Sequence, residues 1–344
     1  MTLPATPDTL GMWEATARLP EQVAAAALAG RAVPLAVEQP VSNVVALGVG
    51  GDGLAGDVLA AVAGGVMAVP LVVVKSAELP AFVGPDSLVF AVSCSGETES
   101  TLAAADRAWA AGAQVIAVSG PGRLARLAER EGSPVVPVPA DVPQARAGLG
   151  ALAVPALVVL ERLGLLPEVG TGIDAAVDQL ARRRDELVGP DNVALDVARR
   201  IGRTFPLVHG SPGLTGVAAQ RWKTQVNENA KSPAFWSVHP DLCHNEVAGW
   251  GQSGDVTRQL LTLVELRHGA EDPAIARRFE LAGEALAEVV ADVVAVWAQG
   301  EGELARFFDL VLVGDFVSLH LAAREGVDPG PVPAVAEIER LVSG

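Results

Sequence analysis

The first half of the chain alternates short, valine-rich apolar runs with alanine-rich segments. The apolar runs lie at Val44–Gly50, Pro70–Ser76, Ser87–Ser93 and Ala113–Gly120. Continuous apolar strands are buried on both faces, and parallel sheets are where such strands usually occur. The segments between them, such as Leu54–Val62 and Glu99–Ala111, have the length and composition of helices. This repeated strand–helix order predicts an α/β fold built on a parallel sheet.

The pattern then closes one domain and begins another. A fifth strand is predicted at Pro134–Ala140, followed by a helix at Ala147–Leu163 that completes the first domain. The charged, amphipathic stretch Pro167–Asn192 predicts a connecting helix. We therefore expect a first domain with an N-terminal helix at residues 1–165, a connecting helix at 166–192 and a second domain at 193–344. A chain of 344 residues exceeds the ~250 to 300 that one core usually supports.

The second half repeats the logic of the first. Further strands are predicted at Pro206–Ser211, Leu260–Leu266 and Asp309–Asp315. Further helices are predicted at Leu214–Ala230, Ala274–Ala298 and Asp315–Glu325. Each domain is therefore expected to be a doubly wound parallel sheet flanked by helices.

Composition and charge exclude several classes of protein. The chain carries 25 Lys and Arg against 41 Asp and Glu, a formal net charge of -16, so it lacks the basic surface that nucleic acids or anionic membranes require. The uncharged stretch Val58–Val74 contains Gly64, Gly65 and Pro70 and is shorter than the ~20 apolar residues of a membrane-spanning helix. The start MTLPATPDTL shows no basic segment before an apolar run, so no secretory signal is expected. Two cysteines, Cys94 and Cys243, form no disulfide framework and fit a reducing cytoplasm.

A first glycine cluster, LGVGGDGLAGD, follows a predicted strand and precedes a helix. Backbone N–H groups at a helix N-terminus are able to bind an anion. The cluster also spells GxGxxG at Gly48, Gly50 and Gly53, the fingerprint of dinucleotide binding. The acidic residue expected at the end of the next strand is missing, since that strand ends at Lys75 and Ser76. A tight turn with close helix packing is the alternative interpretation.

A second cluster, SCSGETEST, again follows a strand and opens a helix. Its hydroxyls at Ser93, Ser95, Thr98 and Thr101, with a glycine that permits a sharp turn, converge on a helix N-terminus. Such a density of neutral donors favours a phosphate ester as the ligand. An ordinary helix cap is the alternative, although a cap needs only one hydroxyl.

The third segment, residues 221–250, combines polar residues, aromatics and two of the five histidines. Glu228 and His244 suit proton transfer, one as a carboxylate base and the other as a group that titrates near neutral pH. Two alternatives stay open. In the first, Glu228 pairs with Lys231 or caps a helix. In the second, His239, Cys243 and His244 bind zinc, although the spacing of these three residues fits no closed structural zinc pattern.

Taken together and in order, these motifs resemble the bifunctional phosphoglucose/phosphomannose isomerases. The resemblance rests on the blocks GVGGDGLAGD, FAVSCSGETEST, NENAKSPAF, HNEVAGW and GDFVSLHLAAREGVDPGPVP. The NENAK and HNE blocks are specific to that family, whereas the SxSGxTxxT loop is common to sugar-isomerase (SIS) domains. The resemblance implies two SIS domains, a homodimer with active sites near the domain and subunit interface, and interconversion of aldose and ketose 6-phosphates without a metal or organic cofactor.

The resemblance also implies a role for each matching residue. Glu228 matches the base that moves a proton between C2 and C1, through a cis-enediolate. His244 matches the histidine that assists ring opening, which in a dimer comes from the partner chain, and Arg146 matches the arginine that stabilises the enediolate. The expected substrate- and phosphate-binding residues are Gly50, Gly51, Asp52, Ser93, Ser95 and Thr98.

Two positions depart from the family pattern. Asp52 stands where the first loop usually has a phosphate-binding serine, and a carboxylate within ~4 Å of a phosphate costs several kcal/mol at an effective dielectric near 20. Near the C-terminus, Glu339 stands where the family has a ring-opening lysine, with Arg340 beside it.

The leading hypothesis is an isomerase that interconverts fructose 6-phosphate with glucose 6-phosphate, mannose 6-phosphate or both. The alternative, motivated by Asp52 and Glu339, is a catalytically weakened SIS protein that binds a sugar phosphate or an amino sugar and acts as a regulator. A third class, a cofactor-dependent oxidoreductase, requires binding of a nicotinamide nucleotide, which we do not expect.

Overall fold

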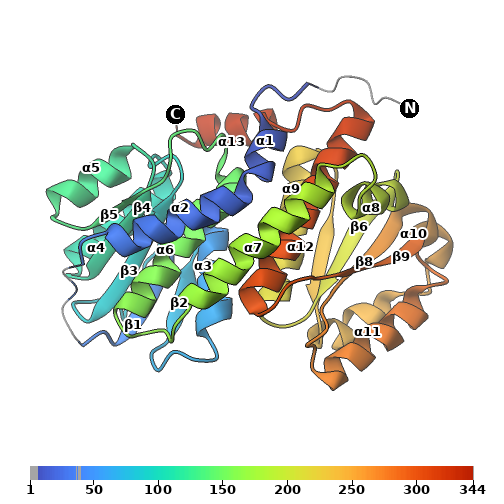
Figure 1. The fold of residues 1–344 in the computed structure, drawn as a ribbon, viewed down its shortest axis with the longest axis horizontal. Coiled ribbons are helices and arrows are strands. Elements are labelled where there is room, and N and C mark those ends of the chain that lie inside the picture. Colours follow the sequence, from blue (N-terminus) through green and yellow to red (C-terminus); the bar gives the residue numbers. More distant parts are fainter. Residues whose placement is uncertain (1–6, 36, 38–39, 344) are drawn as a thin grey trace. The chain divides into compact units, whose positions relative to one another are not determined.

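A computed structural model describes residues 7–35, 37 and 40–343 of the chain (Figure 1). Residues 1–6, part of the start from which we expect no secretory signal, lie outside the described residues. The chain divides into two compact units. The N-terminal unit consists of Arg18–Ala181 and Gly300–Ala305. The C-terminal unit consists of Arg182–Gln299 with the described parts of residues 1–17 and 306–344, so both units are discontinuous in sequence.

The N-terminal unit is built on a parallel sheet whose strands match the predicted apolar runs. Its strands are β1 (Asn43–Leu47), β2 (Leu71–Val74), β3 (Ser87–Ser93), β4 (Gln114–Ser119) and β5 (Val135–Pro137). They are ordered β2-β1-β3-β4-β5, and all neighbouring pairs are parallel. Every residue of β1 and β3 is buried, which is why these strands are continuously apolar.

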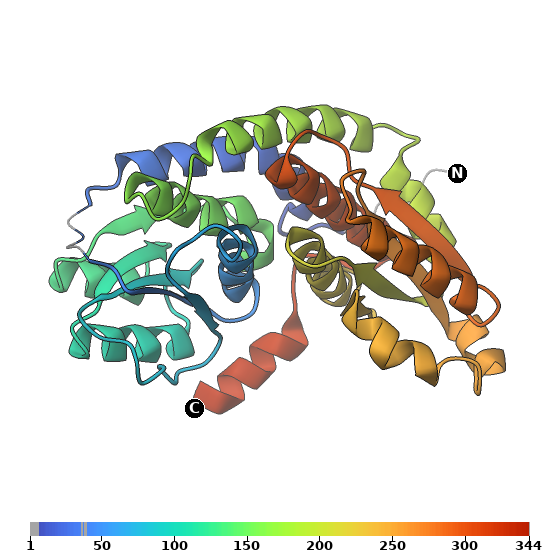
Figure 2. The same ribbon diagram turned by 90° about the horizontal axis from the view of Figure 1, so that it is seen from below.

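Helices cover both faces of this sheet (Figures 1 and 2). They are α2 (Leu19–Ala32), α3 (Gly51–Ala63), α4 (Glu99–Ala110), α5 (Arg123–Arg130) and α6 (Leu149–Arg162), with the short 3-10 helix η1 (Ala145–Ala147) before α6. α4 and α5 pack on one face, while α3 and α6 pack on the other, with α2 against α6. The chain runs from β1 to β2 in one direction along the sheet and from β3 to β4 in the other. Because both connections are right-handed, their helices, α3 and α4, lie on opposite faces of the sheet.

The C-terminal unit contains a second parallel sheet, ordered β7-β6-β8-β9. Its strands are β6 (Phe205–Gly210), β7 (Phe235–Val238), β8 (Leu261–Arg267) and β9 (Asp292–Trp297). The prediction of an α/β fold with two parallel, helix-flanked sheets is confirmed.

The remaining helices belong to this unit or run between the two. They are α1 (Met12–Ala17), α7 (Gly170–Leu187), α8 (Val193–Ile201), α9 (Leu214–Asn229), α10 (Gly254–Leu260), α11 (Pro273–Leu286), α12 (Glu303–Glu325) and α13 (Pro333–Ser343), with the 3-10 helices η2 (Asp241–His244) and η3 (Glu246–Gly249). The long stretch predicted as a connecting helix contains α7, which passes from one unit to the other. Within the described residues, no helix has both the length and the apolar character needed to cross a membrane.

Two predicted elements are wrong. The run Asp309–Asp315 is not a strand but the middle of α12, and the predicted helix Ala274–Ala298 ends at Leu286, with β9 following it. The apolar run between the two aspartates, Leu310–Gly314, is only five residues long, and so short a run has the same pattern in a central strand and in a helix that is buried on all sides. At Ala274–Ala298 an alanine-rich background without Gly or Pro beyond Gly283 hides the change from helix to strand.

Close packing and a buried ion pair join α9 to α12. The indole of Trp222, 1% exposed, donates from Nε1 to the carbonyl of Leu310 at 2.8 Å. Gly314 lies directly beneath this ring, where a Cβ atom would overlap the indole. At the adjacent residues, Arg221 donates from Nε and Nη2 to the two carboxylate oxygens of Asp315 at 3.0 and 2.7 Å. The two helices therefore approach as closely as a glycine allows.

A second buried ion pair joins α12 to α7. Arg183 donates to both oxygens of Asp309 at 2.9 and 3.0 Å, and the backbone N–H of Gln299 donates to the same carboxylate at 2.9 Å. The two aspartates that bounded the predicted strand are thus the polar anchors of the apolar middle of α12. Breaking such a buried pair by removing one partner typically costs about 3–5 kcal/mol.

We predict that Gly314→Ala destabilises the protein, because the added methyl group has no space beside Trp222. Overpacking of this kind costs about 1–3 kcal/mol, which thermal unfolding of the full chain would report as a lower Tm. Gly172→Ala in α7 is the matched control, because its Cβ would meet only Leu304 at an ordinary 3.4 Å. Equal Tm values for the two variants would contradict the proposed close contact.

Candidate functional site

The carboxyl ends of β1 and β3 form the topological switch point of the N-terminal sheet. From β1 the chain crosses to β2 on one side, whereas β3 lies on the other side of β1. Ligands of open α/β sheets bind in the crevice outside the strands at such a point. Both clusters singled out in the sequence lie here, since Gly48–Gly50 follow β1 and Cys94–Thr98 follow β3.

The glycine turn after β1 lies directly against Arg146. Gly50 has a φ of 60°, in the left-handed region that favours glycine. A Cβ on Gly51 would lie 3.1 Å from the backbone nitrogen of Arg146, so only a small residue permits η1 to approach the start of α3. Arg146 itself is 4% exposed. The structure thus brings together Gly50, Gly51 and Arg146, which are far apart in sequence.

The hydroxyls of the second loop do not all face the same way. Ser93 is fully buried, where its Oγ accepts from the N–H of Gly96 at 3.1 Å and lies 3.0 Å from Oγ1 of Thr98. Ser95 Oγ accepts from the N–H of Glu97 at 3.1 Å. Ser95 and Thr98 line a cavity, and Ser93 holds the loop from behind.

Asp52 points into this loop. It is 5% exposed, its Oδ1 accepts from the backbone N–H of Cys94 at 2.9 Å, and its carboxylate also hydrogen-bonds the side chain of Thr98. Burial raises the pKa of Asp52 from 3.8 to about 6, although these two hydrogen bonds work in the opposite direction. The same burial, together with the charge of Asp52, raises the pKa of the Cys94 thiol to about 12. Asp52 therefore titrates close to neutral pH.

The cavity at this switch point has a volume of about 460 Å³. Its lining consists of Asp52, Cys94, Ser95, Thr98, Pro121, Pro139, Ala140, Val142, Pro143, Gln144 and Ala145. Sequence reasoning missed the role of Cys94, whose backbone N–H binds Asp52, and of Gly120 and Gly122. A Cβ at either glycine would overlap a carbonyl oxygen of the Cys94–Ser95 backbone, so both allow the loop after β4 to pack against it. The SGPG sequence at residues 119–122 was the available signal.

In the C-terminal unit, Glu228 lies in the last turn of α9, partly exposed. Its neighbours hold that turn in place. Asn229 donates from Nδ2 to Ser318 on α12 at 2.9 Å, and Asn227 donates to the carbonyl of Ser232 at 2.8 Å. The ammonium of Lys231, a residue with a φ of 54°, hydrogen-bonds the backbone carbonyl of Glu228. The asparagines of the NENAK block therefore position the glutamate between them.

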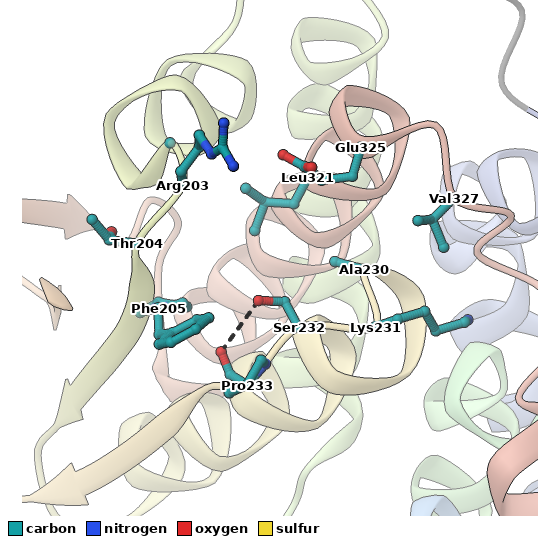
Figure 3. A pocket seen from close by; sticks show the side chains of 12 residues that line it. Arg203, Thr204, Phe205, Ala230, Lys231, Ser232, Pro233, Leu321, Glu325 and Val327 are labelled. Carbon is teal, nitrogen blue, oxygen red and sulfur yellow. Dashed lines mark hydrogen bonds between the residues drawn. The ribbon is translucent and has the colours of Figure 1, made fainter. Parts of the chain in front are cut away.

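A second cavity, of about 430 Å³, adjoins the end of α9 (Figure 3). Figure 3 shows Arg203 and Glu325 on one side of it and Ser232 and Pro233 on another. This cavity lies at the amino end of β6, which begins at Phe205. It is thus at the amino edge of the C-terminal sheet, opposite to the edge at which β6 ends and α9 begins.

His244 lies at the end of η2, exposed, on a loop that Glu246 ties to the sheet. Glu246 Oε1 lies 2.9 Å from Nε2 of His209 on β6, and its other oxygen accepts from the hydroxyl of Ser237 on β7. Burial opposes ionisation of Glu246, but these hydrogen bonds outweigh it and lower its pKa. Glu246 was not singled out in the sequence, although it completes the HNE block.

Glu228 and His244 of one chain lie at opposite edges of the C-terminal sheet. α9 leaves the carboxyl end of β6 and returns to the amino end of β7, so Glu228 is at the amino edge. His244 follows the carboxyl end of β7. Since the 16 residues of α9 span about 24 Å, the two side chains form no direct pair within one chain.

The zinc alternative finds no support in the geometry. Sγ of Cys243 lies 3.4 Å from Nδ1 of His239, and burial lowers the pKa of His239 to about 4. In the part of the chain that the structure describes, no three His, Cys, Asp or Glu side chains are grouped so as to hold a metal ion. His239 packs instead against the rings of Phe279 and His209.

The predicted ring-opening position lies on α13. Glu339 is exposed, and Arg340 donates from Nε and Nη2 to the carboxylate of Glu337 at 2.8 Å. The guanidinium of Arg340 is thus engaged one turn back along its own helix.

Comparisons of the sequence with known proteins identify phosphoglucose isomerases and their SIS domains as its relatives. Residues 190–341 match the model of the bacterial phospho-glucose isomerase C-terminal SIS domain. A bifunctional phosphoglucose/phosphomannose isomerase of Caldicellulosiruptor bescii is 34% identical over 94% of this chain and 96% of its own, and one of Aquifex aeolicus is 32% identical over 87% and 90%. The fold resembles that of a hypothetical protein from Thermus thermophilus, with a TM-score of 0.73 at 18% identity over 97% of this chain and 90% of the other.

The buried Asp52 predicts a pH dependence of stability. Because its pKa is higher in the folded protein, it stabilises the fold fully below about pH 4 and loses that contribution as the pH rises through about 6. We expect the wild type to lose about 3 kcal/mol relative to Asp52→Asn between about pH 4 and 7, since one pKa unit corresponds to about 1.4 kcal/mol.

Urea unfolding of both proteins across this pH range measures the difference. Asp106→Asn, which removes an exposed carboxylate from α4, is the control for net charge. A wild type and an Asp52→Asn variant whose unfolding curves keep a constant separation would show that Asp52 does not change its protonation on folding.

Proposed function

Because this chain belongs to the bifunctional phosphoglucose/phosphomannose isomerase family, and is therefore an isomerase, we propose that it interconverts fructose 6-phosphate with glucose 6-phosphate and mannose 6-phosphate. The reaction exchanges the oxidation levels of C1 and C2 within one sugar. One proton leaves one carbon and one proton enters the other, so no external oxidant or reductant takes part.

Glu228 is the base in this proposal. It removes the proton from C2 of the open-chain aldose, which leaves a cis-enediolate, and it returns a proton to C1 to form the ketose. The observation that carries the assignment is the arrangement around it. Asn227 and Asn229 hydrogen-bond to Ser232 and Ser318, which fixes the last turn of α9, and the side chain of Glu228 in that turn is partly exposed.

The groups of the N-terminal unit hold the substrate. Arg146 stabilises the negative charge that develops on the enediolate oxygens, a role suited to a guanidinium that keeps its charge at all physiological pH values. Ser95 and Thr98 bind the phosphoryl group, and Ser93 positions Thr98 from behind. Gly50 and Gly51 let the sugar approach the backbone. Because the two cysteines, Cys94 and Cys243, fit a reducing compartment, we place the reaction in the cytoplasm.

His244 opens the sugar ring, and it acts in the active site of a partner subunit. The separation of Glu228 and His244 across the sheet supports this part of the proposal, because one chain does not bring them together. A homodimer with two-fold symmetry supplies each site with the histidine of the other chain. Glu339 and Arg340 on α13 are the position where the family has its second ring-opening group.

The second candidate function, a regulatory protein that binds a sugar phosphate or an amino sugar without turning it over, is favoured by one observation. Asp52 places a carboxylate among the donors of the phosphate loop. Tight binding of fructose 6-phosphate without any conversion would support this candidate over the isomerase.

We predict that the wild type forms glucose 6-phosphate and mannose 6-phosphate from fructose 6-phosphate, and that Glu228→Gln lowers kcat about 10²- to 10⁴-fold, the usual contribution of a general base. Coupled assays of each product measure the rates. Glu284→Gln, on the exposed surface of α11, is the control and should keep wild-type activity. Full activity of Glu228→Gln would remove it from the mechanism.

Mixing two inactive variants tests the shared site. In a dimer that pairs Glu228→Gln with His244→Ala, one of the two sites has both an intact Glu228 and an intact His244. Random re-association should therefore restore about a quarter of the wild-type activity, since about half of the dimers are mixed. If the mixture stays as inactive as the separate variants, although mixed dimers are detected by mass, the two residues act within one chain.

A further inference from the structure

The donors of the proposed phosphate loop already hold a carboxylate. Asp52 accepts from the backbone N–H of Cys94 at 2.9 Å and hydrogen-bonds the side chain of Thr98. It is 5% exposed and lines the same cavity as Ser95 and Thr98. Asp52 therefore lies inside the site that the proposed function gives to the phosphoryl group, not beside it.

Other donors of the loop are also engaged by its own side chains. The N–H of Gly96 donates to Ser93 Oγ at 3.1 Å, and the N–H of Glu97 donates to Ser95 Oγ at 3.1 Å. An incoming anion thus meets a loop in which an internal anion is the strongest acceptor. Two unit charges about 4 Å apart repel strongly enough, at an effective dielectric near 20, to change affinity by about 10³-fold.

We propose that Asp52 determines the specificity of this pocket: its carboxylate takes the place of an anion in the loop, and a phosphoryl group binds there only when Asp52 has taken up a proton. The inference rests on the proposed function for the identity of the pocket. Binding of a sugar phosphate is then coupled to uptake of one proton. A ligand that presents a hydroxyl or an ammonium group binds with Asp52 ionised.

The chemistry of the pocket lets Asp52 act in this way near neutral pH. Its burial disfavours the charged form, and its pKa of about 6 lies within reach of physiological conditions. Cys94 is the other titratable residue among the described residues that line the cavity, and its thiol, with a pKa of about 12, stays protonated throughout. Between pH 5 and 8, Asp52 is thus the group of the lining whose charge changes.

Charged groups on the surrounding elements are either constant or held elsewhere. Arg146, on η1, keeps its positive charge over this range. Glu97 turns away from the cavity to the start of α5, where it accepts from the backbone N–H and Nε of Arg123 at 2.9 and 2.7 Å. Asp57, further along α3, is paired with Lys75. The electrostatic contribution of these groups to the pocket therefore stays the same whether Asp52 is protonated or ionised.

Calorimetric titration of the full-length protein with sulfate tests the proposal, because sulfate stays a dianion from pH 5 to 8. For the wild type we expect the affinity to fall about tenfold per pH unit above about 6, with uptake of one proton seen as a dependence on buffer ionisation enthalpy. Asp52→Asn keeps the shape of the side chain without its charge. It should bind sulfate about 100-fold more tightly than the wild type at pH 8, with no such slope.

Asp106→Asn, with the same change of net charge outside the cavity, should behave as the wild type. A wild-type affinity that is independent of pH, or an Asp52→Asn variant no tighter than the control, overturns the inference. Circular dichroism of each variant shows whether it is folded, and Asp52→Ser is the second test if Asp52→Asn is not.

The same proteins separate this inference from the proposed function. If Asp52→Asn gains sulfate affinity but neither protein isomerises fructose 6-phosphate, the role of Asp52 stands and the isomerase assignment fails. If the wild type isomerises fructose 6-phosphate while sulfate affinity ignores Asp52, the isomerase assignment stands and the role of Asp52 fails.

Discussion

The packing of α9 on α12 is the constraint on which the C-terminal unit depends. Because Gly314 has no side chain, the indole of Trp222 packs directly against the backbone of α12. The adjacent pair of Arg221 and Asp315 stabilises the same contact with two charge-assisted hydrogen bonds. Further along the same seam, Asn229 reaches Ser318. Glu228 directly precedes Asn229 in the chain, so the helix contact that stabilises the unit also orients the proposed base. A change that loosens the seam is therefore expected to disturb both stability and chemistry.

Both sheets are parallel and have the same crossover pattern, but their carboxyl edges carry different groups. In the N-terminal unit, the carboxyl ends of β1 and β3 adjoin a cavity lined by Asp52 and by the hydroxyl-bearing residues Ser95 and Thr98. In the C-terminal unit, the carboxyl edge holds the tether between Glu246 and His209, which presents His244 outward. The proposed base lies at the other edge of that sheet. The N-terminal unit thus has a cavity at its carboxyl edge, whereas the C-terminal unit carries its two proposed catalytic groups on separate edges of the sheet.

The net negative charge of the chain and the single buried carboxylate of Asp52 have different effects on binding. A net charge of -16 spread over the surface is solvated and screened, and it disfavours nucleic acid without deciding which small molecule binds. The carboxylate of Asp52 is 5% exposed and accepts from the backbone N–H of Cys94, and burial raises its pKa. In the proposed pocket, we therefore expect the charge of Asp52 to affect ligand choice more than the remaining excess of acidic residues does.

Local pattern by itself determined the parallel sheets, the glycine turn, the hydroxyl loop and the family resemblance, because each depends on residues adjacent in sequence. It failed at Asp309–Asp315, where an apolar run bounded by acids has the same appearance in a strand and in a buried helix. Only the tertiary structure decided that these acids face Arg183 and Arg221, that Asp52 binds the Cys94 backbone, and that Glu228 and His244 lie on opposite edges of one sheet. Those outcomes depend on contacts between residues about 40 to 130 positions apart, or on the direction in which a helix returns along a sheet, and no short stretch of sequence contains either.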